Sequence, residues 1–119
     1  MTGLGRTTTA VALAVAFVLG ASAADLKGSL IDVACSAKII KEGEAAAKAH
    51  TRECMLKESC AKSGYGLYTQ DGKFIVFDAV GNQTAQKALE ASKKKDNIMV
   101  KVSGRQTGDL IEVKTLKII

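Results

Sequence analysis

The sequence predicts a small, mainly β domain of the OB type, which is a five-stranded, partly open barrel. Five segments have the alternation or the β-branched and aromatic content of strands. A helical, cysteine-bearing insert follows the first of them, and a second helix separates the third from the fourth. This order matches the OB fold. A five-stranded open sheet covered by two helices fits the pattern nearly as well.

The N-terminus has the features of a secretory signal peptide. Arg6 lies in a short polar region, residues 10–19 are apolar, and Ala21-Ser22-Ala23 forms a small-x-small cleavage site. The apolar run is shorter than the ~20 residues that span a bilayer, and no second run follows. We therefore expect a signal peptide over 1–23, export to a periplasm or to the medium, and a single domain over 24–119 without a membrane span.

The chain is mildly basic. The formal net charge of +5 falls by one when Arg6 leaves with the signal peptide. The run Lys93-Lys94-Lys95 lies where a helix should end, and cations there complement the helix dipole. The charge therefore does not favour nucleic acid as a partner.

The first three strands are predicted from pattern and turn chemistry. Residues 26–33 form the first strand candidate, in which Gly28 indicates a bulge or a close backbone approach. Residues 66–70 and 73–77 flank Asp71-Gly72. This dipeptide is favoured in two-residue type I′ hairpins, where both central residues need positive φ. A hairpin is therefore expected here.

The insert spans about 35–63 and is predicted to be helical. Residues 44–57 are almost all good helix formers, and Gly43 separates them from 37–42. On one helix His50 and Cys54 would stand at i and i+4, on the same face.

The remaining segments complete the barrel. We expect a turn over 78–83, a short helix capped by Asn82 or Thr84, a strand over 98–103, a loop over 104–109 and a last strand over 110–118. Apolar residues change faces along this last strand, which predicts a bulge or a change of partner near Thr115.

Short motifs extend over nearly the whole mature chain. They are Gly28-x-Leu30-x-Asp32-x-x-Cys35, His50-x-x-x-Cys54, Cys60-Ala61-Lys62-Ser63-Gly64-Tyr65-Gly66, Asp71-Gly72-Lys73-Phe74, Phe77-Asp78, Gly81-Asn82, Val100-x-Val102-x-Gly104 and Gly108-Asp109-x-Ile111-x-Val113. The combination resembles a family of small secreted bacterial proteins of uncharacterised function, with an OB-like barrel and a Cys/His-bearing insert. The resemblance implies export and the barrel but no activity, so function is argued from the site.

Three cysteines and the single histidine carry the available chemistry. Cys35, His50, Cys54 and Cys60 offer soft ligands that suit Zn or Cu and are enough for a tetrahedral site. Their spacing is not that of a standard zinc motif, and the separation of Cys54 from Cys60 is wider than in the usual knuckle. An oxidising compartment also favours a disulfide over free thiols.

The alternative for the cysteines is structural. A Cys35–Cys60 disulfide would close the base of the insert and stabilise it by ~3 kcal/mol. Cys35–Cys54 would act similarly, and Cys54–Cys60 would clamp only a helix end. The remaining thiol, beside His50, would be a redox candidate with a lowered pKa. Without C-x-x-C a thioredoxin-like function is not indicated.

No enzyme class is predicted, because neither G-x-S-x-G nor a P-loop accompanies the single histidine. The preferred hypothesis is an exported binding module, fixed by a disulfide, that holds a soft or borderline metal ion at His50 and the cysteines. The alternative is an interaction module that binds a glycan, nucleic acid or protein on the 65–77 hairpin face. That face would use Tyr65, Tyr68 and Lys73, with the cysteines purely structural.

Overall fold

The computed structural model describes Gly3 and residues 20–119, so most of the predicted signal peptide lies outside the described residues. Its main feature is a closed barrel of five strands in the order β1-β2-β3-β5-β4, with β4 returning to β1. The strands are β1 (Ser22–Asp32), β2 (Tyr65–Thr69), β3 (Phe74–Phe77), β4 (Met99–Thr107) and β5 (Leu110–Ile118). Only β3 and β5 pair in parallel. The predicted OB-like barrel is confirmed.

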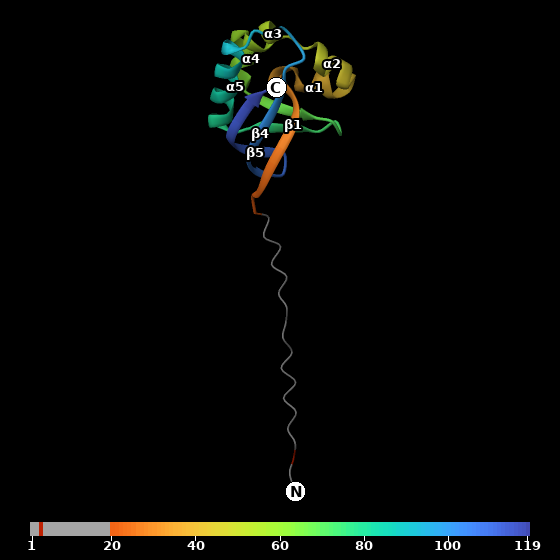
Figure 1. The fold of residues 1–119 in the computed structure, drawn as a ribbon. Coiled ribbons are helices and arrows are strands. Elements are labelled where there is room, and N and C mark those ends of the chain that lie inside the picture. Colours follow the sequence, from red (N-terminus) through yellow and green to blue (C-terminus); the bar gives the residue numbers. More distant parts are fainter. Residues whose placement is uncertain (1–2, 4–19) are drawn as a thin grey trace.

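Four short helices form the insert between β1 and β2, and one longer helix lies between β3 and β4. They are α1 (Val33–Glu42), α2 (Glu44–Ala49), α3 (Arg52–Leu56), α4 (Glu58–Ser63) and α5 (Ala79–Ala91). The insert covers one end of the barrel and α5 runs along its side (Figure 1). Within the described part of the chain, no helix combines the length and apolar character needed to cross a membrane.

The barrel interior is built from aliphatic residues of all five strands. The buried set includes Leu30, Leu67, Ile75, Val100, Val102 and Ile111. Helix α5 contributes Ala85 and Leu89 to the same cluster, and Met55 joins it from α3. The insert is thereby anchored to the core that closes the barrel.

The β2–β3 hairpin is confirmed, but its predicted type I′ turn is wrong. The Thr69 amide donates to the Lys73 carbonyl at 2.9 Å, so the loop has three residues, 70–72. Gly72 has φ +80, and Asn97 is the only non-glycine among the described residues with positive φ. Three-residue loops of this kind need a left-handed residue only at their last position.

The insert contains two separate helices where one was predicted over 44–57. Helix α2 ends at Ala49, His50 and Thr51 are extended, and α3 begins at Arg52. Two contacts explain the break: the Thr51 hydroxyl accepts from the Cys54 amide at 3.1 Å, and the Arg52 amide donates to the Lys95 carbonyl at 2.8 Å. His50 and Cys54 therefore do not share a helix face, and that prediction was wrong.

Helix α5 begins earlier than predicted, so the turn over 78–83 was also wrong. Asp78 is the N-cap, and its Oδ1 accepts from the amides of Gly81 at 3.0 Å and Val113 at 3.1 Å. A Cβ on Gly81 would lie 2.5 Å from Val113 Cγ2. Gly81, which lies within the predicted turn, instead allows the first turn of α5 to lie against β5.

The last hairpin has one longer strand and a shorter loop than predicted. β4 continues to Thr107, whereas β5 has the expected bounds. Ser103 pairs with Thr115 and Gly104 with Val113, which leaves Lys114 as an extra residue and confirms the bulge near Thr115.

The first strand is longer than expected. β1 begins at Ser22, and Ala23 pairs with Arg105. Cleavage after Ala23 would therefore leave β1 starting at Ala24. The close backbone approach predicted at Gly28 is confirmed, because a Cβ there would lie 2.3 Å from the Tyr68 carbonyl oxygen.

Candidate metal centre

The site is organised around Asp32, the last residue of β1 and the N-cap of α1. Its carboxylate is fully buried. Oδ2 accepts from the Cys35 amide at 3.1 Å, and Oδ1 accepts from His50 Nε2 at 2.6 Å. The adjacent Val33 amide donates to the Gly64 carbonyl at 2.9 Å, which brings the end of α4 close to the start of α1. One aspartate thus fixes the strand end, the first turn of α1 and the histidine.

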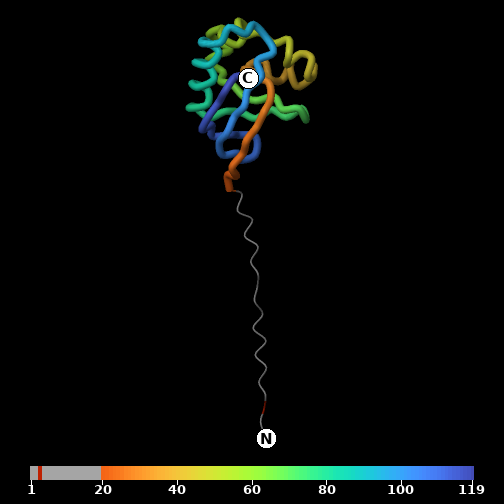
Figure 2. The backbone as a smooth tube through the Cα atoms, in the orientation of Figure 1, coloured from red at the N-terminus to blue at the C-terminus, as the bar shows by residue number. Residues whose placement is uncertain are grey.

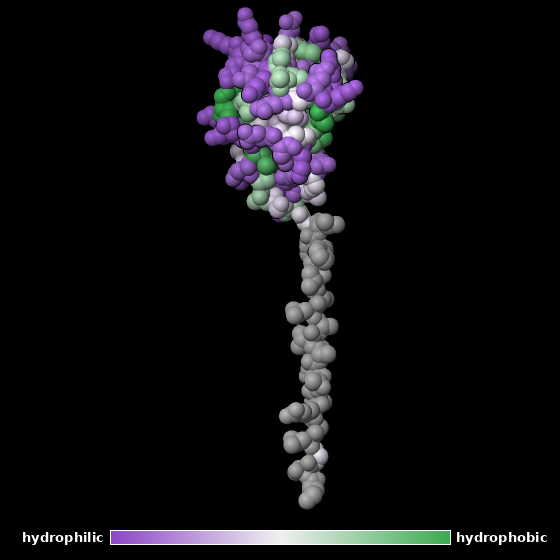
Figure 3. Space-filling model, turned by 90° about the vertical axis from the view of Figure 1, so that its right-hand side faces the viewer, coloured by the Kyte–Doolittle hydropathy of each residue, from purple (hydrophilic) through white to green (hydrophobic). Residues whose placement is uncertain are grey.

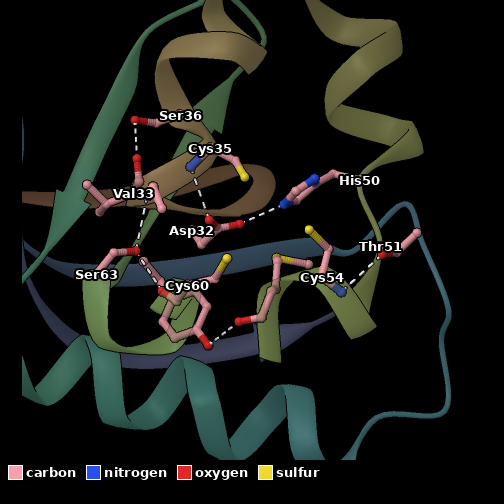
Figure 4. Close-up of polar contacts among 12 residues, drawn as sticks. Asp32, Val33, Cys35, Ser36, His50, Thr51, Cys54, Cys60 and Ser63 are labelled. Atoms are coloured by element: carbon pink, nitrogen blue, oxygen red, sulfur yellow. Dashed lines mark hydrogen bonds and ion pairs between the residues drawn. The ribbon is translucent and has the colours of Figure 1, made fainter. Parts of the chain in front are cut away.

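The three cysteines come from three different helices and their sulfur atoms meet beside Asp32 (Figure 4). Cys35 is in α1, Cys54 in α3 and Cys60 in α4, and their Sγ atoms all lie within 4.8 Å of one another. Cys35 and Cys54 are half-buried, and Cys60 is buried. The break between α2 and α3 is what orients Cys54 toward the other two.

His50 belongs to a second, overlapping set of ligand atoms. An Asp32 oxygen, the Cys35 sulfur and a His50 ring nitrogen also lie within 4.8 Å of one another. The four ligands predicted from the sequence are therefore neighbours, but they do not form one four-membered group. The three sulfurs form one group, and His50 is held beside it by Asp32.

Burial and the Asp32 charge raise the pKa of two of the three thiols. Burial, and then the Asp32 carboxylate, raise the pKa of Cys35 to about 12 and also raise that of Cys60. Both side chains are consequently neutral thiols at physiological pH. A reactive thiol requires a lowered pKa, so neither residue fits the redox role considered from the sequence.

The Asp32 carboxyl shifts in the opposite direction. Burial by itself raises the pKa of Asp32, but hydrogen bonds from His50 and Cys35 and the charge interaction with His50 outweigh it. The net effect lowers the pKa of Asp32, so its carboxylate is charged at neutral pH. The three thiols therefore lie next to a permanent negative charge.

The structure contains no disulfide, and all three cysteines are free. The predicted disulfide clamp is not formed in this structure. Instead, the Tyr65 hydroxyl donates to the Met55 carbonyl at 2.8 Å, and Arg52 donates to the Leu89 and Glu90 carbonyls at the end of α5. These hydrogen bonds join α3 to β2 and α5 without a covalent link.

A shallow groove leads to the site from solvent. It has a volume of about 240 Å³ and is lined by α1, by α2 and by Cys35, His50 and Cys54. Cys60 does not line it. A ligand entering through the groove would reach two sulfurs and the histidine first, and the buried third sulfur last.

The tyrosine face required by the alternative hypothesis is not exposed. Tyr65 is 0 % exposed and lies in the barrel core, and Tyr68 is 8 % exposed. Lys73 lies near the hairpin turn and pairs with Asp71 at 3.8 Å. The two tyrosines predicted for this face therefore do not present their rings to a ligand.

Asp32 was not among the site residues predicted from the sequence. An aspartate between a strand and a helix signals an N-cap, and Asp32 does cap α1. Its second bond joins it to His50, 18 positions away, and no local pattern carries that contact.

Comparison with known proteins found no matching family model, no similar curated protein and no similar solved structure. The family resemblance noted from the motifs therefore stays a prediction.

Proposed function

We propose that the protein is an exported, non-enzymatic binding module that holds one soft or borderline metal ion, Cu(I) or Zn(II), through Cys35, Cys54 and Cys60. The observation that carries the proposal is the convergence of three free sulfurs from three helices within 4.8 Å. Thiolates are the ligands that these metals prefer.

The sulfur spacing is compatible with a shared ion. A metal–sulfur bond is about 2.3 Å long, so sulfurs around one ion lie roughly 4 Å apart. The observed upper limit of 4.8 Å requires only a small contraction. Two of the three helices are five or six residues long, so such a movement involves short segments.

The local charge also favours a cation. The Asp32 carboxylate opposes ionisation of the Cys35 and Cys60 thiols, but it attracts a positive ion placed among the sulfurs. A bound metal lowers the pKa of a coordinating thiol and displaces its proton. The same charge that keeps the empty site unreactive would therefore stabilise the occupied one.

His50 has a supporting role in this proposal. Its Nε2 is engaged by Asp32 at 2.6 Å, which fixes the ring and the carboxylate together. Groups that hydrogen-bond to the ligating residues orient them, and Asp32 is bonded in this way to the Cys35 amide. The sulfurs would be the ligands, and the Asp32–His50 pair would hold Cys35 and the entrance of the groove in place.

The test is metal loading with thiol counting. Protein lacking residues 1–23 is reduced, loaded anaerobically with Zn(II) or Cu(I), and desalted. We expect one equivalent of metal, with the three thiols protected from alkylation until a chelator is added. C54S removes one of the three proposed ligands and should therefore abolish metal retention. Because Cys54 is only half-buried, the substitution leaves the core intact. M99L is the matched control, since Met99 carries a sulfur but lines a different groove that no cysteine borders.

Three results would overturn the proposal. The first is no retained metal in the reduced protein. The second is equal retention by wild type and by a variant with all three cysteines replaced by serine. The third is a single disulfide in the exported protein that, after reduction, forms again on reoxidation even when metal is present. In that last case the cysteines are structural.

A further inference from the structure

Three lysines from neighbouring strands stand side by side on the outer surface of the barrel. The register places Lys27 of β1 opposite Lys101 of β4, and Lys101 opposite Lys117 of β5. All three are exposed. We infer that these residues, named here the lysine row, form a binding surface for an acidic polysaccharide, separate from the metal centre.

The lysine row destabilises the folded protein through charge repulsion unless a bound partner compensates that repulsion. Side chains directly opposite each other in a sheet have Cβ atoms about 5 Å apart, and like charges at such positions destabilise the pair. Elsewhere on the same strands Arg105 faces Glu112, an opposite charge. Among the described residues, the lysine ion pairs join Lys48 to Glu44, Lys62 to Glu58 and Lys73 to Asp71, and none includes the row.

The row borders a groove with further polar groups. This groove, of about 440 Å³, is lined by the three lysines, by Asp25 and by the hydroxyl residues Ser103 and Thr115. Ser103 and Thr115 contact each other through their hydroxyls. β1, β4 and β5 lie next to one another in both ribbon and tube views (Figures 1 and 2). No residue of the metal centre lines this groove.

The groove beside the lysine row lacks the features that bind other negatively charged partners. Single-stranded nucleic acid binds on exposed aromatic rings. No aromatic residue lines the groove, and Tyr65, Tyr68 and Phe77 are buried. A turned view of the molecule is dominated by hydrophilic side chains, with hydrophobic ones in small separate patches (Figure 3).

The mixture of groups favours a glycan over a polymer of phosphates. Three ammonium groups match repeated carboxylates or sulfates. Asp25 repels any polyanion, but it can accept hydrogen bonds from sugar hydroxyls, which inorganic polyphosphate lacks. Ser103 and Thr115 can donate to or accept from the same hydroxyls. An acidic polysaccharide presents both kinds of group, and therefore fits the whole groove.

The experiment compares two triple variants of the full mature chain with equal changes of charge. K27Q/K101Q/K117Q removes the lysine row. K41Q/K57Q/K87Q removes three exposed lysines on or next to the helices. Binding to alginate, a polyuronate, is measured by titration at low and high ionic strength. Neutral dextran, single-stranded DNA and inorganic polyphosphate serve as comparison ligands.

We expect the row variant to bind alginate roughly tenfold more weakly than wild type, because each exposed charge contact contributes a factor of a few. The control variant should lose much less, and binding should weaken with salt. The row variant should also unfold at the same temperature or higher, since it has lost a repulsion.

Several results would overturn the inference. One is the absence of alginate binding, and another is an equal loss in both triple variants, which indicates a net-charge effect only. Tighter binding to DNA or polyphosphate would assign the row to nucleic acid or phosphate polymers. A row variant that unfolds at a lower temperature would show that the lysines are structural.

Discussion

At the scale of single residues, Asp32 connects the fold to the chemistry. It ends β1, caps α1 and holds His50, and it is completely buried. Among the described residues, no buried side-chain nitrogen or oxygen lacks a hydrogen-bond partner, so this polar centre is fully satisfied. Buried polar groups of this kind stabilise a fold while all their bonds are made, and destabilise it strongly when one partner is removed.

The substitution D32N is expected to destabilise the protein by about 2 kcal/mol, because the charged hydrogen bond to His50 is lost while the shape is retained. It should also change the dependence of stability on pH. The pKa of Asp32 is lowered in the folded state. Its contribution is therefore complete above the unfolded pKa of about 4 and is lost as pH falls through the lower folded value.

Urea denaturation of wild type and D32N over a series of acidic pH values measures both effects. The difference between the two proteins should shrink as pH falls below about 4. D109N is the control, since Asp109 is an exposed turn residue. A difference that stayed constant down to the lowest pH would mean that the Asp32 charge does not contribute.

At the scale of elements, the β4–β5 hairpin depends on a close contact at its bulge. A Cβ on Gly104 would lie 2.0 Å from the Glu112 carbonyl oxygen. Gly108 in the connecting turn has φ +57 and no atom near its missing Cβ. We expect G104A to destabilise by about 3 kcal/mol through overpacking, and G108A by only about 1 kcal/mol through backbone strain.

Thermal and denaturant unfolding of the two alanine variants distinguishes steric from conformational cost. Both substitutions add the same single methyl group to the same hairpin. If G108A destabilised the protein as much as G104A, the close approach at the bulge would not explain the effect of G104A.

Elements with a local signal were predictable from the sequence. Period-two alternation and the change of face along 110–118 gave the last strand and its bulge, and Asp71-Gly72 marked the hairpin. The break at His50 was not predicted, because residues 44–57 have high helix propensity and, apart from the local Thr51 cap, the contacts that interrupt them come from Lys95 and Asn97. Tertiary contacts overrode propensity there.

The candidate site, too, could be predicted from the sequence only in part. Residue type identified Cys35, Cys54, Cys60 and His50 as chemically relevant, and the fold does bring them together. The grouping of three sulfurs, with His50 directed to Asp32, depends on where four short helices end. The tyrosines were misjudged for two reasons: Tyr65 belongs to the barrel core, and Tyr68 packs against Ile39 of α1 and Ala47 of α2, which a period-two pattern does not indicate.

At the scale of the whole molecule, the barrel has its own core and the insert supplies the chemistry. The proposed metal would join α1, α3 and α4, which makes metal binding and the stability of the insert thermodynamically linked. A ligand that binds only the folded state at a hundred times its Kd stabilises it by about 2.7 kcal/mol. Metal should therefore raise the Tm of wild type but not that of C54S.

The pH dependence of metal binding follows from the thiol pKa values. Burial and the Asp32 charge raise the pKa of Cys35 to about 12, and they also raise that of Cys60, so at neutral pH both must lose a proton to coordinate a metal. The apparent affinity should consequently fall as pH decreases, by about tenfold per pH unit for each thiol that ionises.

Competition with a chromophoric chelator between mildly alkaline and mildly acidic pH measures this slope, with the chelator's own protonation as the correction. Proton release on binding, followed in weakly buffered solution, gives an independent count. A flat profile, or binding without proton release, would mean that these thiols are not the ligands and that the metal is held elsewhere.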